Sequence, residues 1–502
     1  MTATVQTVAA QVQGRVQRLG DAFASLSPAQ VIAAVFAFAV VLIPGSVFND
    51  PDTFWHIAAG RWMIEHRAVL KTDVFSYTWA GKPWASHEWL AEIVMAAAYM
   101  AGGWTGVMLL FAASLGLAAW LLAGGIGRWM GPLGQAVALT LALFVIAPTV
   151  LARPHLLMLP ILVAWTREML AAREAHRAPR WWFALFMLAW ANLHGSFVFG
   201  FVLAGGFGLE ALVARGADRL KVIRDWGIFG ALCILAALAT PHGISGLIAP
   251  FDIMFMGTLD QIIEWKPANF SKFTPFEGAI LVTLLICLAK GVRVPLVRAV
   301  LMLFIFHMAL QHQRHQLVVA VIMPLLLAEP IGRAFNRQPG SVAMTRAGSI
   351  MLAVLALGFA GWRIADPAVR KDDGITPVSA LAHVPPELAA RPVFNAYNFG
   401  GYLIFKGVKV FIDGRADMYG DAYVKRYSQA NKGDAATIDK LFKQYDIAWV
   451  ITQPKEGVVE VVSKRPGWKK IYGDKYAVVL AREDALPKAA GPAPQAKPQP
   501  KP

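Results

Sequence analysis

The chain has 502 residues, of which 57% are hydrophobic and only 16% are charged, which is far more apolar surface than one soluble core of this length needs. The composition therefore argues against a water-soluble enzyme. The formal charge of +15 does not point to a nucleic acid partner, because the basic residues fall in short gaps between apolar runs, as they do in membrane proteins. Both cysteines lie inside apolar runs, so neither a disulfide framework nor Cys-based zinc chemistry is expected.

Apolar runs predict about eleven transmembrane helices within residues 29–362, after a polar N-terminal segment at 1–28. We expect the first helix to be retained as an anchor instead of being cleaved as part of a signal peptide. The stretch from Trp89 to Met100 is also apolar, but we expect it to be interfacial or re-entrant, because a crossing there would place the basic loop 173–180 outside. The predicted spans are 31–47, 104–126, 132–150, 155–171, 181–193, 197–214, 226–241, 277–290, 296–311, 316–334 and 347–362.

The gaps between these spans form two alternating sets. One set is rich in basic residues, for example Arg173, Arg177 and Arg180, and is predicted to be cytoplasmic. The other set is poor in basic residues and carries the polar clusters, which are therefore expected on the outer side. The N-terminus is then cytoplasmic and the C-terminus periplasmic, in a multi-pass protein of the bacterial inner (cytoplasmic) membrane.

Residues 363–485 have more charges and shorter apolar runs, which predicts a small periplasmic α/β domain. The tail at 486–502 consists of proline, alanine and lysine with few other residues, and is expected to be disordered. Within the domain we predict strands at 408–412 and 447–451, a helix at 437–444 and a pair of strands within 468–480.

The first outer loop, 48–88, holds the leading candidates for catalysis. Asp50 before Pro51 is typical of a helix cap, which is one interpretation of that carboxylate. Asp52 and His56 are spaced to share one face of a helix. Such a pair suits a general base, or two ligands of a divalent cation such as Mg or Mn.

The order of the polar motifs across residues 29–335 resembles the GT-C class of polytopic glycosyltransferases, including the bacterial relatives of the dolichyl-phosphate-mannose protein mannosyltransferases. The motifs that carry the resemblance are Asp50-Pro51-Asp52, Gly81-Lys82-Pro83-Trp84, Glu88-Trp89-Leu90, Arg153-Pro154 and Asn192-Leu193-His194-Gly195. The resemblance implies that Asp50 or Asp52 deprotonates an acceptor or helps to place a metal ion, and that the donor is a sugar on a polyprenyl phosphate. Family members often carry adjacent acidic residues here, whereas Pro51 separates them in this chain.

Other outer polar residues are candidates for binding the substrates. The basic side chains expected to hold the donor phosphate are Arg153, Arg314 and Lys82. Those expected to contact the sugar or the acceptor are His56, Trp55, Glu264, Trp265, His194, Asp413 and Arg415. Three structural alternatives stay open: a snorkelling Arg153, a helix end at His194, and an ordinary turn at Asp413-Gly414.

These patterns predict an enzyme that moves a sugar from a polyprenyl-phosphate donor to an extracytoplasmic glycan, lipid or protein. Its partners would be that donor, the acceptor and membrane lipids, with no nucleic acid. A transporter or flippase of lipid-linked sugars is the alternative, as is a non-catalytic polysaccharide assembly protein. The transporter predicts ionisable residues deep within several helices, and the predicted spans are nearly free of charge.

Overall fold

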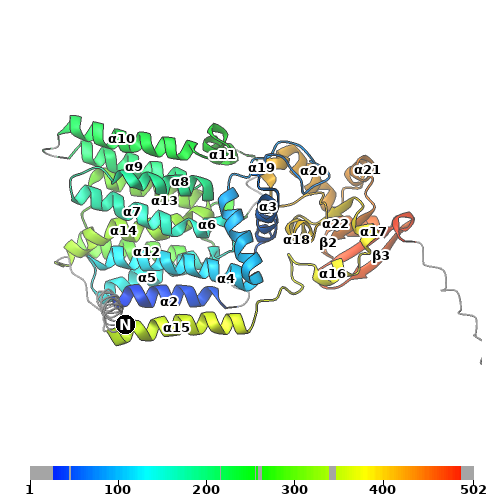
Figure 1. Ribbon diagram of the computed structural model, residues 1–502, viewed down its shortest axis with the longest axis horizontal. Coiled ribbons are helices and arrows are strands. Elements are labelled where there is room, and N and C mark those ends of the chain that lie inside the picture. Colours follow the sequence, from blue (N-terminus) through cyan, green and yellow to red (C-terminus); the bar gives the residue numbers. More distant parts are fainter. Residues whose placement is uncertain are drawn as a thin grey trace, which may run out of the picture. The chain divides into compact units, whose positions relative to one another are not determined.

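The computed structural model describes residues 27–43, 47–214, 216, 218–254, 256–257, 263–337 and 346–487. Their contacts define two compact units (Figure 1): a larger one made of residues up to Lys71 with Ala85–Val369, and a smaller one made of Thr72–Trp84 with the residues from Arg370 onward. Part of the first outer loop therefore belongs with the C-terminal domain. Nearly all of the predicted N-terminal segment 1–28 and of the tail 486–502 lies outside the described residues.

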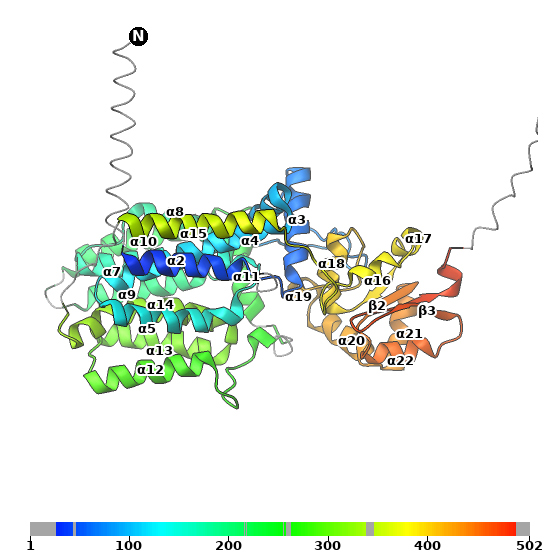
Figure 2. The same ribbon diagram turned by 90° about the horizontal axis from the view of Figure 1, so that it is seen from below.

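The larger unit is a bundle of helices that run side by side (Figures 1 and 2). Every predicted span overlaps one of its helices: α2 (Pro28–Val41), α4 (Trp89–Gly127), α5 (Pro132–Ile146), α7 (Leu159–Glu174), α8 (Ala184–Leu193), α9 (Phe197–Leu212), α10 (Arg219–Leu238), α12 (Pro275–Lys290), α13 (Leu296–Gln311), α14 (Gln316–Ala334) and α15 (Arg346–Ala365). By length and composition, four described segments are suited to cross a membrane: Trp89–Gly127, Pro132–Thr149, Pro154–Glu174 and Gln313–Ala334. The chain is thus a helical membrane protein, while eleven crossings stay a prediction.

Helix α4 consists of two helical segments joined at Gly102-Gly103, whose backbone is not helical. Gly103 has a φ of 56°, a conformation that glycine adopts at no steric cost. Three residues further on, a β-carbon at Gly106 would lie 2.1 Å from the carbonyl oxygen of Ala98, so only glycine allows the second segment to approach the first this closely. The stretch from Trp89 to Met100 is therefore a helix distinct from the one that follows, and its interfacial or re-entrant position stays a prediction.

The first outer loop begins with helix α3 (Asp52–His66), which packs against α4. The approach is close, because a β-carbon at Gly60 would lie 1.9 Å from the carbonyl oxygen of Glu92. This contact fixes the start of α3, and with it Asp52 and His56, against the N-terminal end of α4. A further helix that the sequence analysis did not predict, α11 (Ile244–Met254), follows α10.

The smaller unit is an α/β domain, as predicted, with a four-stranded sheet in the order β1-β2-β4-β3. Strands β1 and β2 are parallel, and the other two pairs are antiparallel. The strands are β1 (Val393–Asn395), β2 (Trp449–Thr452), β3 (Trp468–Gly473) and β4 (Val478–Arg482), and the helices are α16 (Val378–Ala382), α17 (Pro386–Ala389), α18 (Gly400–Phe405), α19 (Ala416–Tyr419), α20 (Asp421–Asn431), α21 (Ala435–Gln444) and α22 (Gly457–Ser463).

Three of the four elements predicted in this domain are confirmed: β2, α21 and the closing pair β3 and β4. The strand predicted at 408–412 is wrong. That segment pairs with the first outer loop instead of joining the sheet, through a parallel bridge between Val410 and Ser76. Because the partner lies more than 300 residues earlier, the local apolar pattern gave no sign of it.

Candidate active site

The start of α3 brings two carboxylates together with an indole. Oδ1 of Asp50 accepts a hydrogen bond from the backbone N–H of Asp52 at 2.8 Å, so Asp50 does cap the first turn. Oδ1 of Asp52 accepts one from the Trp55 indole N–H at 3.0 Å. The second oxygen of each carboxylate, Oδ2, faces Arg153. The helix cap made by Oδ1 of Asp50 therefore does not prevent Asp50 from pairing with this arginine.

Arg153 lies at the centre of the cluster, just before helix α6 (Pro154–Leu157). Its guanidinium lies 3.4 Å from both Asp50 Oδ2 and Asp52 Oδ2 and 2.9 Å from Glu264 Oε2. One arginine thus gathers carboxylates from two separate loops. This arrangement does not fit a snorkelling arginine, which would reach out to water or lipid headgroups.

Arg314 and Trp265 complete this side of the site. The Arg314 guanidinium lies 3.7 Å from Glu264 Oε1 and 4.3 Å from the centre of the Trp265 ring, over its face. Glu264 therefore bridges the two arginines. Among the described residues, Arg314 has one carboxylate at ion-pair distance where Arg153 has three, so Arg314 is the less neutralised of the two cations.

The charges of the cluster shift the proton affinities of its members. Burial and the neighbouring Asp50 carboxylate raise the pKa of Asp52 to about 6, against the opposing effect of Arg153. Burial alone would raise the pKa of Glu264, but Arg153 and Arg314 lower it to about 2. At neutral pH Glu264 is an anion fixed by its arginines, whereas Asp52 is ionised and sufficiently basic to accept a proton.

Two further carboxylates, those of Glu88 and Glu92, contact the ring of His56. The Nδ1 atom of His56 lies 3.2 Å from Glu92 Oε1, and its Nε2 atom lies 3.8 Å from Glu88 Oε2. Burial lowers the pKa of His56 to about 4, although Glu88 and Asp52 oppose this, so the ring is neutral at neutral pH. Sequence analysis missed Glu92 as a site residue, although a carboxylate within an apolar helix is a signal of function or pairing.

Glu88 also receives His194. The backbone N–H of Ser196 donates to Nδ1 of His194 at 3.0 Å, so the proton of the neutral ring resides on Nε2. That Nε2 lies 3.4 Å from Glu88 Oε1. Burial and the positive charge of Arg314 hold the pKa of His194 well below its ordinary value. His194 is thus a neutral donor oriented toward Glu88, at the C-terminal end of α8.

Lys82 belongs to the smaller unit and not to the unit that holds Arg153 and Arg314. Its side chain is exposed, and Nζ lies 3.9 Å from the centre of the Trp79 ring. The turn before it requires Gly81, which has a φ of 75°. The Gly-Lys-Pro-Trp motif therefore closes the segment 72–84 and presents the Lys82 ammonium to solvent.

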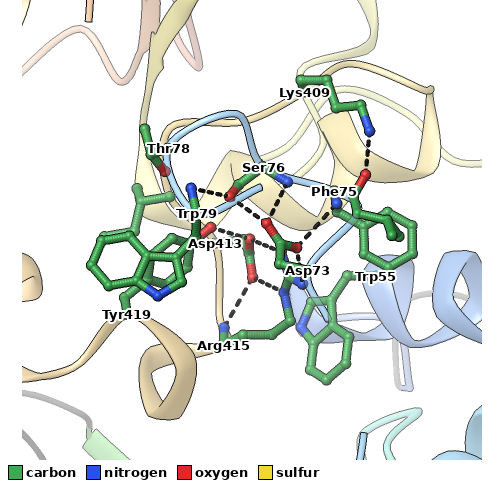
Figure 3. Close-up of polar contacts among 12 residues, drawn as sticks. Trp55, Asp73, Phe75, Ser76, Thr78, Trp79, Lys409, Asp413, Arg415 and Tyr419 are labelled. Atoms are coloured by element: carbon green, nitrogen blue, oxygen red, sulfur yellow. Dashed lines mark hydrogen bonds and ion pairs between the residues drawn. The ribbon is translucent and has the colours of Figure 1, made fainter. Parts of the chain in front are cut away.

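Asp413 and Arg415 lie inside the smaller unit, where they hold the loop segment 72–84 (Figure 3). Arg415 Nη1 lies 2.7 Å from Asp73 Oδ1, and Nη2 lies 2.7 Å from Asp413 Oδ2. The Tyr419 hydroxyl donates to the same oxygen of Asp413 at 2.7 Å. All three charged side chains are fully buried. This structural role replaces the glycan-binding surface expected from sequence, because neither Asp413 nor Arg415 is exposed to a ligand.

The predicted metal ligands do not come together as a set. Asp50 and Asp52 face Arg153, and the two ring nitrogens of His56 face Glu92 and Glu88. Among the described residues, no group of three His, Cys, Asp or Glu side chains is arranged to hold a metal ion. The arrangement therefore does not fit a resident divalent cation.

The fold of the chain, but not its sequence, is similar to that of known proteins. No protein family and no curated protein matches the sequence. The fold matches the oligosaccharyltransferase of Archaeoglobus fulgidus in its apo form with a TM-score of 0.53 and 10% identity, over 84% of this chain and 69% of that one. The chain has the GT-C fold. ArnT of Cupriavidus metallidurans, bound to undecaprenyl phosphate, aligns with a TM-score of 0.46 and 12% identity over 92% of this chain and 98% of that one.

Proposed function

We propose that the chain is a membrane glycosyltransferase that moves a sugar from a polyprenyl-phosphate donor to a hydroxyl group of an extracytoplasmic acceptor. One observation carries this proposal: Asp52, a carboxylate with its pKa near neutral, shares Arg153 with two further carboxylates beside a second arginine, Arg314. A proton acceptor and cations for a phosphate leaving group are what glycosyl transfer requires. The GT-C fold, and the undecaprenyl phosphate held by ArnT, agree with such a donor.

In this proposal Asp52 is the general base. Its carboxylate accepts the proton of the acceptor hydroxyl while the acceptor oxygen forms a bond to the anomeric carbon of the sugar. The bond between that carbon and the phosphate oxygen breaks, and the polyprenyl phosphate leaves with the electron pair. Asp50 supports the base by capping α3 and by raising the pKa of Asp52.

The two arginines have different roles. Arg153 is held by three carboxylates, which together raise its pKa against the lowering effect of burial, so it is permanently charged and keeps Asp52 in place. Arg314 has only Glu264 as an ion-pair partner in the described part of the chain, at 3.7 Å. We assign the leaving phosphate chiefly to Arg314, with Arg153 as a second cation, and the sugar ring to the surroundings of Trp265 and Glu264.

The ionisable residues inside the bundle favour an enzyme over a transporter. Glu210, Arg298 and Glu329 form ion pairs at 3.0 and 3.7 Å, but they lie toward the helix ends that border the arginine-rich loops. A transporter would place such groups near the membrane midplane, along the path of the substrate. These pairs instead tie α9, α13 and α14 together.

The test compares envelope glycans and lipid-linked sugars in cells that lack the gene and carry wild type, Asp52→Asn, Asp50→Asn or Asp252→Asn at equal membrane abundance. Asp252, exposed on α11, is a matched control for the loss of one carboxylate. We expect Asp52→Asn to slow transfer by about 10²–10⁴-fold, so that the lipid-linked donor accumulates. Full restoration of the glycan by Asp52→Asn would contradict the proposal.

A further inference from the structure

The larger unit contains an apolar groove that the proposed reaction does not use. Its volume is about 670 Å³, and it lies between α5, α12, α13 and α14. These helices are neighbours in the bundle (Figures 1 and 2). Its rim is open, because Leu133, Leu284 and Leu303 are 77%, 51% and 67% exposed. The groove therefore faces the surroundings of the bundle, which for a membrane protein are lipid chains.

One end of the groove is basic. Arg337 lines it, and its guanidinium lies against Gly131, where a β-carbon would be only 2.6 Å from Nη2. Lys290 adds a second cation there, with Nζ 4.7 Å from the centre of the ring of Phe335, which also lines the groove. This end borders the loops that the positive-inside pattern predicts to be cytoplasmic, and it lies at the opposite end of α5 from Arg153.

Within the described residues, these two cations differ from their neighbours, which each have a carboxylate partner. Arg128 pairs with Glu174 at 2.7 Å, Arg298 with Glu210 at 3.0 Å and Arg333 with Glu329 at 2.8 Å. No carboxylate in the described part of the chain lies within ion-pair distance of Arg337 or Lys290. Two uncompensated cations at the end of an apolar groove are complementary to an anion that carries a long apolar chain.

We infer that this groove binds an anionic phospholipid, with an acyl chain between α5, α12, α13 and α14 and the headgroup phosphate at Arg337 and Lys290. Basic pockets between membrane helices on the cytoplasmic side bind such headgroups, and each cation near an anionic lipid contributes about 1 kcal/mol. The lipid would fill a groove across which the lining apolar side chains otherwise have no packing partners. The site is separate from the proposed catalytic cluster and does not depend on it.

The experiment titrates purified full-length protein in detergent with phosphatidylglycerol or with phosphatidylcholine of the same acyl chains, and counts bound lipid by native mass spectrometry. Without sugar donor or acceptor, the readout is independent of catalysis. We expect phosphatidylglycerol to bind tighter by about 25-fold, or about fivefold for each cation, and R337Q/K290Q to remove most of that preference. R219Q removes an exposed charge on the same predicted side of the membrane and should have no effect.

A second variant tests the groove itself. Ala138→Trp fills the space between α5 and its neighbours and should abolish binding of both phospholipids. If that variant does not fold, R337Q/K290Q still decides the matter. Equal affinity of wild type for the two phospholipids, or unchanged affinity of R337Q/K290Q for phosphatidylglycerol, would overturn the inference. Displacement of phosphatidylglycerol by a polyprenyl phosphate in wild type would also overturn it, since the groove would then belong to the donor.

Discussion

Each of the two units holds an arginine among carboxylates, and the difference between the two clusters distinguishes the proposed active site from a structural one. Arg415 is fully buried, and both aspartates lie 2.7 Å away. Arg153 has a side chain that is 19% exposed, and its three carboxylates lie 2.9 to 3.4 Å away. The first cluster is closed and saturated, while the second is accessible and has longer contacts that a substrate can rearrange.

The largest expected effect comes from breaking the closed cluster. Arg415→Gln leaves the carboxylates of Asp73 and Asp413 buried without a cation, which costs about 3–5 kcal/mol and unfolds much of the smaller unit. Thermal unfolding and limited proteolysis of the purified full-length protein measure this loss. The control is Arg465→Gln: its ion-pair partner Asp439 is 70% exposed and stays solvated without the arginine, so this change should cost less than about 1 kcal/mol. Similar losses in the two variants would contradict the comparison.

The open cluster should respond in activity more than in stability. Arg153→Gln removes the cation that holds Asp52 and faces the phosphate, and we expect the transfer rate to fall by about 10²–10³-fold. The unfolding midpoint should drop less than in Arg415→Gln, because the carboxylates left behind can reach water. Transfer is measured on membranes with a lipid-linked sugar donor. Wild-type activity in Arg153→Gln would show that the Arg153 cluster has a structural role and no role in transfer.

The two clusters should also show opposite pH dependence. The pKa of Asp52 is raised to about 6, so kcat/KM should fall about tenfold per pH unit below 6, and Asp52→Asn should abolish this limb. A raised aspartate pKa favours folding at low pH, and this contribution is lost as pH rises from about 4 to 6. Arg415 lowers the pKa of Asp73 although burial opposes this, so its contribution is lost as pH falls below the ordinary value of 3.8. A pH–rate profile and pH-dependent unfolding test these signs.

A smaller effect is expected from two hydrogen bonds within the smaller unit, since a bond to a charged acceptor should stabilise the fold more than a bond to a neutral one. Tyr419→Phe removes a donor to the Asp413 carboxylate and should cost about 1.5–3 kcal/mol. Tyr423→Phe removes a donor to the neutral carbonyl of Phe411 at 2.9 Å and should cost about 1 kcal/mol. Chemical denaturation of the two variants gives the difference. A larger loss of stability in Tyr423→Phe than in Tyr419→Phe would show that the charge of Asp413 does not strengthen its hydrogen bond from Tyr419.

The smallest change in stability is expected at Lys82. Its exposed contact with Trp79 is worth about 0.5–1 kcal/mol, so Lys82→Gln should unfold almost as wild type does. If the ammonium also contacts the donor phosphate, KM for the donor should rise by about tenfold with kcat nearly unchanged. Steady-state kinetics with varied donor measures this. An unchanged KM would remove Lys82 from the phosphate-binding residues.

The sequence by itself determined most helices of the membrane unit and most residues of the candidate site, α11 and Glu92 being the exceptions. Long apolar runs form helices through local hydrogen bonds and the burial of neighbouring side chains, so each of the eleven predicted segments is helical. The same local pattern predicted β2, α21 and the pair of β3 and β4. The sequence also indicated four candidate site residues, Asp52, Arg153, Glu264 and Arg314, because polar residues next to apolar runs need partners.

Only the tertiary structure decided which of these polar residues meet. Arg153 and Glu264 are separated by 111 positions, and Arg415 and Asp73 by 342. A carboxylate on any loop can neutralise an arginine, so the sequence contains many equivalent pairings, and the packing of the helices selects one. That selection made Asp413 and Arg415 a buried support for the segment 72–84, and it placed Asp52 and Arg314 in the open cluster to which we assign proton transfer and phosphate binding.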